Sequence, residues 1–396
     1  MARSTPRGIA CRLRLGEDFV KLVFVDLAPW DYDAETPLNS PLGGTQSAAV
    51  YLAAELAALG HEIVFVNDVK APRVSRGVQF INANSIDGHF LNQFDAIVSI
   101  SGVMGAAFRR DSGVTKPLIL WVHHAIDQPA VQNLKNSEEK DAWTAFAMVS
   151  AWQAETYHRQ FAIPRDRVVI KRNAVSPAFL ESKIPEPWFV RGDAPVLAYT
   201  STPFRGLDVL LMAFPTIRKA IPDARLRVFS SMATYRVPSE NDNYALLYEL
   251  CRSLPGVDYV GALPQRELAK ELSGTAALSY PSTFAETSCI SVMEAMASGA
   301  MILATESGAL PETAHGFGRL LPLKGSRLDL ASAYAAMAID ELKAAYSRPQ
   351  ETAAKLDEQV KFVRSHYTWA ARAREWQDWL ASLLANPNSQ CIPASN

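Results

Sequence analysis

Residues 281–299 read Pro-Ser-Thr-Phe-Ala-Glu-Thr-Ser-Cys-Ile-Ser-Val-Met-Glu-Ala-Met-Ala-Ser-Gly. They follow a predicted strand at 276–280 and open a predicted helix at 289–297, with Ser288 placed to cap it. The start of a helix exposes unpaired N–H groups and a positive dipole end, which suits a diphosphate. This strand-loop-helix unit therefore predicts both a parallel α/β fold and an anion site.

This unit contains two glutamates. Glu286 lies just before the helix and Glu294 lies inside it, so one can face a cleft while the other reaches a group deeper in the protein. Carboxylates accept hydrogen bonds, and the vicinal hydroxyls of a sugar or ribose supply two donors. For Glu286 alone, a favourable contact with the helix dipole is the competing interpretation.

Outward from this unit, short apolar runs alternate with helical patterns in both directions, which is typical of parallel sheets covered by helices. The clearest helix covers 45–59 and ends at Gly60. A segment rich in Pro and charge at 182–193 separates two such series. The predicted strands are 21–27, 63–67, 78–81, 96–101, 118–123, 146–150 and 168–171 before that segment, then 196–200, 225–229, 257–260, 276–280 and 301–304 after it.

The fold class predicted is therefore α/β, with two Rossmann-like, doubly wound domains facing a central cleft. The tail at 328–384 reads as two or three helices with an apolar seam of Trp369, Trp376 and Trp379. The predicted organisation is a mobile basic leader at 1–19, an N-terminal acceptor domain at 20–183, a linker at 184–194, a C-terminal donor domain at 195–366, a final helix at 367–385 and a tail at 386–396.

Composition narrows the function. The 396 residues hold 39 Lys+Arg and 41 Asp+Glu, and this balance gives no general field for a nucleic acid. No apolar run reaches the length of a membrane-spanning helix, and the leader lacks the apolar core of a signal peptide. The four cysteines, at 11, 251, 289 and 391, have no metal-ligand spacing and read as reduced thiols. We expect a cytoplasmic protein with at most peripheral contact at the inner face of a membrane.

A second loop-helix junction lies near the N-terminus, at Pro41-Leu-Gly-Gly-Thr-Gln46. Gly43 and Gly44 would let the backbone approach a phosphate, and Thr45 would start a helix whose N–H groups point the same way. An ordinary turn is the alternative.

Two further segments carry polar groups at predicted strand ends. His123 and His124 end the strand at 118–123, where ligand crevices of open α/β sheets lie, although a structural hydrogen-bonding role is the common alternative. Arg205 follows Ser201 and Thr202 just before a helix, where a cation is disfavoured unless an anion joins it. A surface charge is the other interpretation of Arg205.

Together these segments resemble one family. Glu286-x7-Glu294, the following Ala-Met-Ala-Ser-Gly and the continuation Glu306-Ser-Gly-Ala-Leu-Pro-Glu312 closely resemble the donor-site signature of the family-4 retaining glycosyltransferases with the GT-B fold. The resemblance extends to the glycine-rich loop at 41–46 and to the strand end at His123, and it implies a final helix that crosses back to the N-terminal domain.

The resemblance implies roles for these residues. Glu294 would hold the ribose of a nucleotide, Glu286 would contact hydroxyls of the transferred sugar, and His123 would lie close to the reacting sugar. His123 and Glu286 are thus the predicted catalytic residues. The predicted donor-binding residues are Gly43, Gly44, Arg205, Ser288 and Glu294, with Thr45, His124, Ser201, Thr202, Thr287 and Cys289 as further candidates.

Two departures from the family pattern stand out. The family's His is often followed by Asp, whereas here His124 follows His123, which leaves open which ring faces the cleft. The family commonly has an Arg where this chain has Thr200, so either Ser201 and Thr202 bind phosphate as neutral donors or another cation is supplied elsewhere.

The function that the resemblance implies is retaining, metal-independent transfer of a sugar from a nucleoside diphosphate sugar to an acceptor, with no cofactor. The Asp31-Tyr-Asp33 sequence has the form of a metal motif, but we predict a loop there. A nucleotide-sugar epimerase of the same fold and a non-catalytic sugar-nucleotide-binding subunit are the alternatives. A dinucleotide oxidoreductase is disfavoured because no Gly-x-Gly-x-x-Gly follows the first strand. The sugar, nucleobase, acceptor, linkage and oligomeric state are not readable from the sequence.

Overall fold

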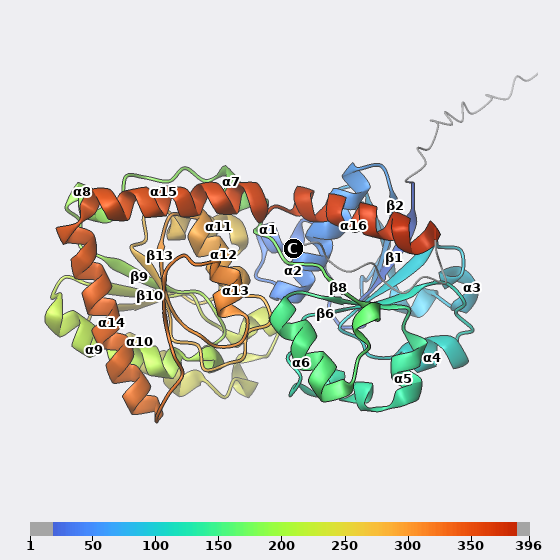
Figure 1. The fold of residues 1–396 in the computed structure, drawn as a ribbon, viewed down its shortest axis with the longest axis horizontal. Helices are drawn as coiled ribbons and strands as arrows, with labels where there is room; N and C mark the ends of the chain where they lie inside the picture. Colours follow the sequence, from blue (N-terminus) through green and yellow to red (C-terminus); the bar gives the residue numbers. More distant parts are fainter. Residues whose placement is uncertain (1–18, 386–396) are drawn as a thin grey trace, which may run out of the picture.

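The computed structural model describes residues 19–385. The predicted leader and tail lie outside these residues, except for position 19. The chain forms two α/β domains side by side, each with a central sheet between layers of helices (Figure 1). The predicted α/β class with two Rossmann-like domains is confirmed.

The first sheet has eight strands in the order β3-β4-β2-β1-β5-β6-β7-β8, all parallel except for the β3–β4 pair. Its strands are β1 (Lys21–Val25), β2 (Glu62–Asn67), β3 (Arg73–Ser75), β4 (Val78–Asn82), β5 (Ala96–Ile100), β6 (Leu118–Val122), β7 (Ala145–Met148) and β8 (Val168–Ile170). β3 was not predicted, since its three residues are too few to form an alternating pattern.

The second sheet has six parallel strands in the order β11-β10-β9-β12-β13-β14. Its strands are β9 (Val196–Tyr199), β10 (Arg225–Val228), β11 (Val257–Tyr259), β12 (Ala277–Tyr280), β13 (Met301–Thr305) and β14 (Arg319–Leu321). β14 was also missed, because it is equally short and begins with an exposed arginine.

Helices cover both sheets. Those of the first domain are α1 (Thr36–Asn39), α2 (Gly44–Ala58), α3 (Gly88–Leu91), α4 (Gly105–Arg110), α5 (Ser137–Ala142) and α6 (Ala151–Phe161). The next helix, α7 (Pro177–Glu181), packs on the second domain, whose core includes Phe179. The later helices are α8 (Trp188–Arg191), α9 (Leu207–Ala220), α10 (Ala245–Ser253), α11 (Gln265–Leu272), α12 (Ile290–Ala297), α13 (Leu310–Ala314), α14 (Arg327–Ser347), α15 (Pro349–His366) and α16 (Trp369–Ala385). Single 3-10 turns are η1 (Ala83–Ser85), η2 (Pro129–Lys135), η3 (Arg165–Arg167), η4 (Pro203–Arg205), η5 (Met232–Tyr235) and η6 (Ser239–Asn241).

Alternate residues of the first sheet's strands point to opposite faces and enter separate cores. Leu22 and Phe24 join one hydrophobic cluster with α2, whereas Val23 and Val25 join the cluster on the other face. Because both faces are covered, β5 and β6 are buried along their whole length. This is why these strands read as continuous apolar runs in the sequence.

The final helices join the two domains. α15 lies along the second domain and α16 continues along the first (Figure 1), where Trp369 and Trp376 enter the same core as α2. Trp376 meets Trp121 of β6 edge to face, with ring centroids 5.2 Å apart. The segment expected to be a linker contains α8, whose Trp188 is buried against Tyr346 of α14. That segment is therefore packed on the second domain rather than extended.

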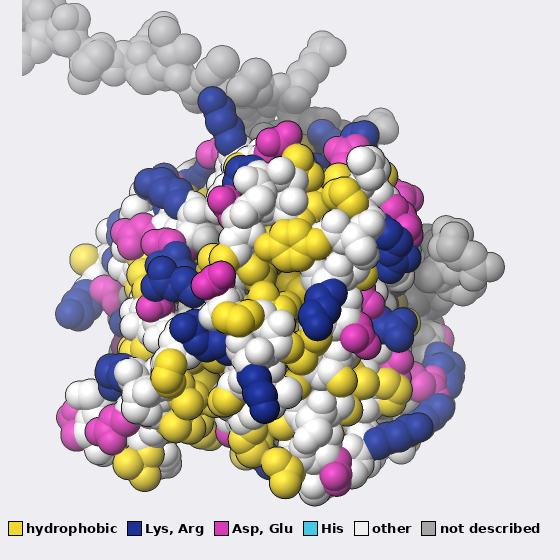
Figure 2. All heavy atoms as spheres, turned by 90° about the vertical axis from the view of Figure 1, so that its left-hand side faces the viewer, with side chains coloured by type: hydrophobic (Ala, Val, Ile, Leu, Met, Phe, Trp, Pro, Cys, Tyr) yellow, Lys and Arg dark blue, Asp and Glu magenta, His cyan; other side chains and the backbone are white. Residues whose placement is uncertain are grey.

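The surface carries both positive and negative side chains, as the near-neutral composition leads one to expect. At the end of the second domain formed by α8, α9, α10 and α14, hydrophobic side chains are interspersed with charges of both signs (Figure 2). Within residues 19–385, no helix combines the length and the apolar character needed to cross a bilayer. Cys251 and Cys289 are free thiols, and both are buried.

Candidate functional site

A cavity lies between the two domains, at the carboxyl ends of strands from both sheets. It brings together most of the residues predicted from the sequence. Those that line it are Gly44, Thr45, His123, Ser201, Thr202, Arg205, Glu286, Thr287, Ser288, Cys289 and Glu294. Gly43 and His124 are the two predicted residues that do not line it.

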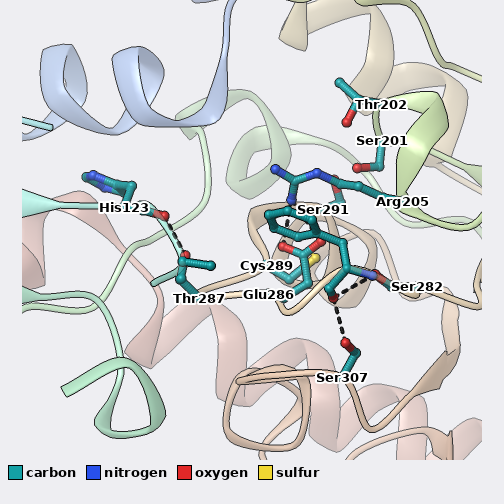
Figure 3. A network of polar contacts seen from close by, with 12 residues as sticks. His123, Ser201, Thr202, Arg205, Ser282, Glu286, Thr287, Cys289, Ser291 and Ser307 are labelled. Atoms are coloured by element: carbon teal, nitrogen blue, oxygen red, sulfur yellow. Dashed lines mark hydrogen bonds and ion pairs between the residues drawn. The ribbon is translucent and has the colours of Figure 1, made fainter. Parts of the chain in front are cut away.

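The loop before α12 places Glu286 against Arg205. Arg205 Nη1 donates to both carboxylate oxygens of Glu286, at 2.8 and 2.7 Å (Figure 3). The Tyr280 hydroxyl donates to one of them at 2.5 Å. Glu286 is only 3% exposed. Burial lowers the pKa of Arg205, but the Glu286 carboxylate more than offsets this and the pKa stands well above its usual value. The two residues expected to bind separate parts of a donor are thus ion-paired.

Residues 306–309 form hydrogen bonds to this loop. Ser307 Oγ donates to the Phe284 carbonyl oxygen at 2.6 Å, and the Ala309 N–H donates to the Glu286 carbonyl oxygen at 2.6 Å. Gly308 has φ of 64°, and a Cβ there would lie 2.3 Å from the Glu286 carbonyl oxygen. Only glycine allows this approach of backbone to backbone.

The helix that follows begins differently from the prediction. The N-cap of α12 is Cys289 rather than Ser288, and no side chain of that residue caps the helix. Thr313 Oγ1 instead accepts from the Cys289 N–H at 3.5 Å. The expected capping role of Ser288 is therefore wrong, although the residue lines the cavity. The helix begins one residue later than predicted, at Ile290, so the N-cap position falls on Cys289.

Glu294 also lines the cavity. It is 4% exposed, and Gln265 Nε2 donates to its Oε1 at 3.1 Å. Burial raises the pKa of Glu294 to about 8. Below that pH the group is largely protonated, and in either state its oxygens can accept a hydrogen bond from a ligand hydroxyl, which the dry setting strengthens.

The hydroxyl-bearing residues 200–202 line the cavity together with Arg205. The Ser201 Oγ lies 3.2 Å from the Tyr280 hydroxyl oxygen, whose one proton goes to Glu286. The hydroxyl oxygens of Thr200 and Thr202 are buried and have no partner within residues 19–385. Among the lining residues of this cavity, Arg205 is the one Lys or Arg. A second cation is therefore not supplied by the cavity wall in the described part of the chain.

His123 lines the cavity from the first domain, whereas His124 does not. His123 Nε2 pairs with Asn173 Oδ1 at 3.2 Å, and Thr287 Oγ1 donates to the His123 carbonyl oxygen at 2.7 Å across the cleft (Figure 3). Burial lowers the pKa of His123 to about 3, so the ring is neutral at physiological pH. The carbonyl oxygen of His124 accepts from Gln153 and Tyr157 within the first domain.

The glycine-rich loop faces the second domain. A Cβ at Gly43 would lie 3.3 Å from Cε1 of Tyr235, and one at Gly44 would make only ordinary contact with Ile290. α2 begins at Gly44, one residue before the predicted Thr45. Gly43 thus brings the loop close to Tyr235, while Gly44 and Thr45 contribute directly to the cavity wall.

Sequence reasoning missed Gln265 and Tyr235, which line the cavity. Gln265 is the first residue of α11 and follows a proline. Its place at the start of a helix in a βα unit was the sequence feature that could have marked it as a site residue. Tyr235 lies in a short 3-10 turn that has no periodic pattern.

The Asp31-Tyr-Asp33 segment is a loop, as predicted. Arg73 bonds to both carboxylates, at 2.6 Å each. Across residues 19–385, no three side chains of His, Cys, Asp or Glu come together in a way that could hold a metal ion. Metal independence stays a prediction.

Comparisons with known proteins agree with this architecture. Residues 194–340 match the family model described as Glycosyl transferases group 1. Comparison with curated protein sequences gives no significant match. Residues 194–340 are therefore similar to a group 1 glycosyltransferase domain.

Several solved structures share the fold over nearly the whole chain. HepE of Anabaena, in complex with UDP-glucose, has a TM-score of 0.67 at 14% identity, covering 92% of this chain and 100% of that one. Sucrose-phosphate synthase from Thermosynechococcus elongatus has a TM-score of 0.68 at 16% identity, covering 92% and 99%. WaaG, a glycosyltransferase involved in lipopolysaccharide biosynthesis, has a TM-score of 0.61 at 14% identity, covering 91% and 99%. The predicted GT-B fold is confirmed.

Proposed function

We propose that this GT-B chain, with its similarity to a group 1 domain, is a glycosyltransferase that moves a sugar from a nucleoside diphosphate sugar to an acceptor with retention of anomeric configuration. One observation carries the proposal: Glu286, Glu294 and Arg205 line a single interdomain cavity together with His123. A sugar nucleotide presents hydroxyls at both ends and anionic charge in the middle, and this cavity has carboxylates at two positions and a cation near one of them.

In this proposal, Glu294 accepts hydrogen bonds from the ribose and Glu286 from the transferred sugar. Arg205 serves both Glu286 and the diphosphate, because a guanidinium has five N–H donors and the buried Nε–H of Arg205 has no partner among the described residues. The hydroxyls of Thr200 and Thr202, which have no partner within residues 19–385, supply further donors in the same cavity. The N-terminus of α12 adds its dipole.

The transfer forms a bond between the acceptor oxygen and the anomeric carbon while the bond from that carbon to the phosphate oxygen breaks. The family resemblance implies that the leaving phosphate takes the acceptor proton, so the acceptor attacks from the side of the departing group and configuration is retained. Arg205 would stabilise the charge that develops on the diphosphate. His123, neutral through burial, would act as a hydrogen-bonding group rather than as a cation.

We propose that this chemistry runs without a metal ion, since Arg205, the hydroxyls and the helix N-terminus can stabilise the leaving group. Turnover in excess chelator should equal turnover in its absence. Loss of activity under chelation, with recovery on adding manganese, would overturn this part of the proposal.

A panel of nucleotide sugars, including UDP-glucose, tests the function. We expect nucleotide release that depends on an added acceptor, and a product that keeps the donor's anomeric configuration by NMR. Conversion of the donor to a new sugar nucleotide without acceptor would instead indicate an epimerase. Binding without turnover across the panel would indicate a non-catalytic subunit.

A further inference from the structure

A chain of hydrogen bonds runs from the first domain to Glu294. Tyr51, on α2, donates from its hydroxyl to Gln265 Oε1 at 2.5 Å. Gln265, the first residue of α11, donates from Nε2 to Glu294 Oε1 at 3.1 Å. The connection therefore spans two domains, from a helix of the first sheet to the predicted ribose-binding carboxylate.

The direction of this chain is set by the chemistry of its members. A tyrosine hydroxyl has one proton, and Tyr51 gives it to Gln265, so Ser176 Oγ must donate in its 3.0 Å contact with the Tyr51 hydroxyl. An ionised Glu294 can only accept, so the Gln265 amide must turn its nitrogen towards it. Tyr51 thereby holds the Gln265 amide in the orientation in which its nitrogen donates to Glu294.

The members are held rigidly. Tyr51 is 2% exposed and packs on Trp369 of α16, with ring centroids 6.3 Å apart. Glu294 is enclosed within α12. Gln265 also lines the cavity, so a ligand that reaches Glu294 lies beside this amide.

We propose that Gln265 is a positioning residue for the donor site: held by Tyr51 of the first domain, its amide orients the Glu294 carboxylate and couples nucleotide binding to the arrangement of the two domains. The inference rests on the proposed function, because it takes Glu294 as the ribose acceptor. The coupling is reciprocal, so bound nucleotide should favour the arrangement in which Tyr51 reaches Gln265.

Calorimetric titration with UDP, GDP and ADP tests the proposal on the full chain. For whichever nucleotide binds the wild type, we expect Gln265→Leu to lower the affinity by about 10-fold. Tyr51→Phe should lower it by about 3- to 10-fold. The double variant should bind no more weakly than Gln265→Leu, because Tyr51 acts through Gln265. Gln350→Leu on the exposed side of α15 and Tyr346→Phe on α14 are matched controls outside the cavity and should bind as the wild type does.

The pH dependence of binding separates positioning from a merely structural effect. Ribose hydroxyls donate to the ionised carboxylate, so affinity should rise as pH passes through about 8, where Glu294 ionises. Gln265→Leu removes a donor to that carboxylate and should move the midpoint to higher pH. Measurements from pH 7 to 8.7 stay above the ionisation of the terminal phosphate, near pH 6, and below the ionisation of the uracil and guanine bases.

The other groups around Glu294 keep their charge over this range. Tyr51 and Cys289 interact with Glu294, and burial raises the pKa of both. His123, in the same cavity, stays neutral, and Arg205 stays ionised. The midpoint therefore reports on Glu294.

Three outcomes overturn the proposal. These are wild-type affinity in both single variants, additive losses in the double variant, and an unchanged pH midpoint in Gln265→Leu. Thermal unfolding of each variant establishes that it is folded, and Tyr51→Phe, which removes one oxygen atom, keeps the test open if Gln265→Leu is unstable. If no nucleoside diphosphate binds the wild type, the proposed function itself fails, and this outcome is distinct from the other three.

Discussion

Glu286 and Glu294 belong to one sequence motif, but their carboxylates have different surroundings. Glu286 has Arg205 as an ionic partner and Tyr280 as a second donor. Within residues 19–385, the Glu294 carboxyl group receives one hydrogen bond, from the neutral amide of Gln265. A buried carboxylate without an opposite charge pays a desolvation penalty when it ionises, and this is why the pKa of Glu294 is raised.

This environment predicts a pH-dependent cost to stability. Below about pH 4.5, Glu294 is protonated in both the folded and the unfolded chain. Between 4.5 and 8 only the unfolded chain releases the proton, so the free energy of unfolding falls by as much as about 1.4 kcal/mol per pH unit on account of this group. Above pH 8, Glu294 is ionised in both states, and its destabilising contribution no longer changes with pH.

Glu294→Gln removes that cost. We expect the variant to gain stability relative to the wild type as pH rises from 5 to 8, measured as the free energy of unfolding in urea at each pH. Glu249→Gln, at an exposed position of α10, should show no such trend. A stability difference that stays constant with pH would show that Glu294 is not the source.

At the scale of elements, the site depends on two loops that pack backbone to backbone. The loop that carries Glu286 is held by the stretch 306–309, which leads directly into α13. Gly308 is the point of closest approach. The shape of the donor loop is therefore set by a second loop about twenty residues further along the chain.

Gly308→Ala should disrupt this packing. Its Cβ would lie within 2.5 Å of both the backbone nitrogen and the carbonyl oxygen of Glu286, so the loop must shift. We expect a loss of stability beyond the roughly 1–2 kcal/mol that left-handed backbone costs a non-glycine residue, and at least a 10-fold loss of nucleotide-sugar turnover.

Gly316→Ala is the matched control, because Gly316 has a similar positive φ of 82° and no atom within 4 Å of its added Cβ. That variant should lose stability through backbone strain alone and keep its turnover. Equal effects of the two substitutions on turnover would refute the bracing role of Gly308.

At the scale of the whole molecule, several contacts bridge the domains at once. Thr287 donates to His123 across the cavity, Tyr51 donates to Gln265, and α16 carries the chain back to the first core. Glu312 of α13 adds a fourth bridge. Its carboxylate accepts from the Ala151 N–H at 2.9 Å and the Trp152 N–H at 3.2 Å, and from Arg172 at 3.0 Å. A carboxylate of one domain thus lies at the N-terminus of a helix, α6, of the other, where its charge is favoured.

Glu312→Ala should loosen the arrangement of the domains. The loss of an N-terminal carboxylate contact of this kind costs about 0.5–2 kcal/mol. We expect small-angle X-ray scattering to give a larger radius of gyration for the variant, and turnover to fall. Arg172→Ala removes only the half-exposed ion pair and should have a smaller effect, under about 1 kcal/mol. An unchanged scattering profile for Glu312→Ala would contradict the bridging role.

The sequence by itself determined the α/β class, the two βα series and the segments that supply the cavity. These follow from local patterns: apolar runs for strands buried on both faces, glycines and polar residues at strand ends, and a continuous motif at 281–299. It also led to the correct choice of a loop for Asp31-Tyr-Asp33. The short strands β3 and β14 and the N-cap of α12 were not recovered, because each depends on one to three residues held by distant partners.

Only the tertiary structure decided how side chains from separate segments pair. The Arg205–Glu286 ion pair joins residues 81 positions apart, and the link from Tyr51 to Gln265 joins residues 214 apart. It also decided that His123 rather than His124 lines the cavity. Such contacts depend on the packing of two domains and on which groups are removed from water together. A linear pattern records residue types and spacing, whereas burial and pairing, which set the charge of Glu294 and His123, arise when the domains meet.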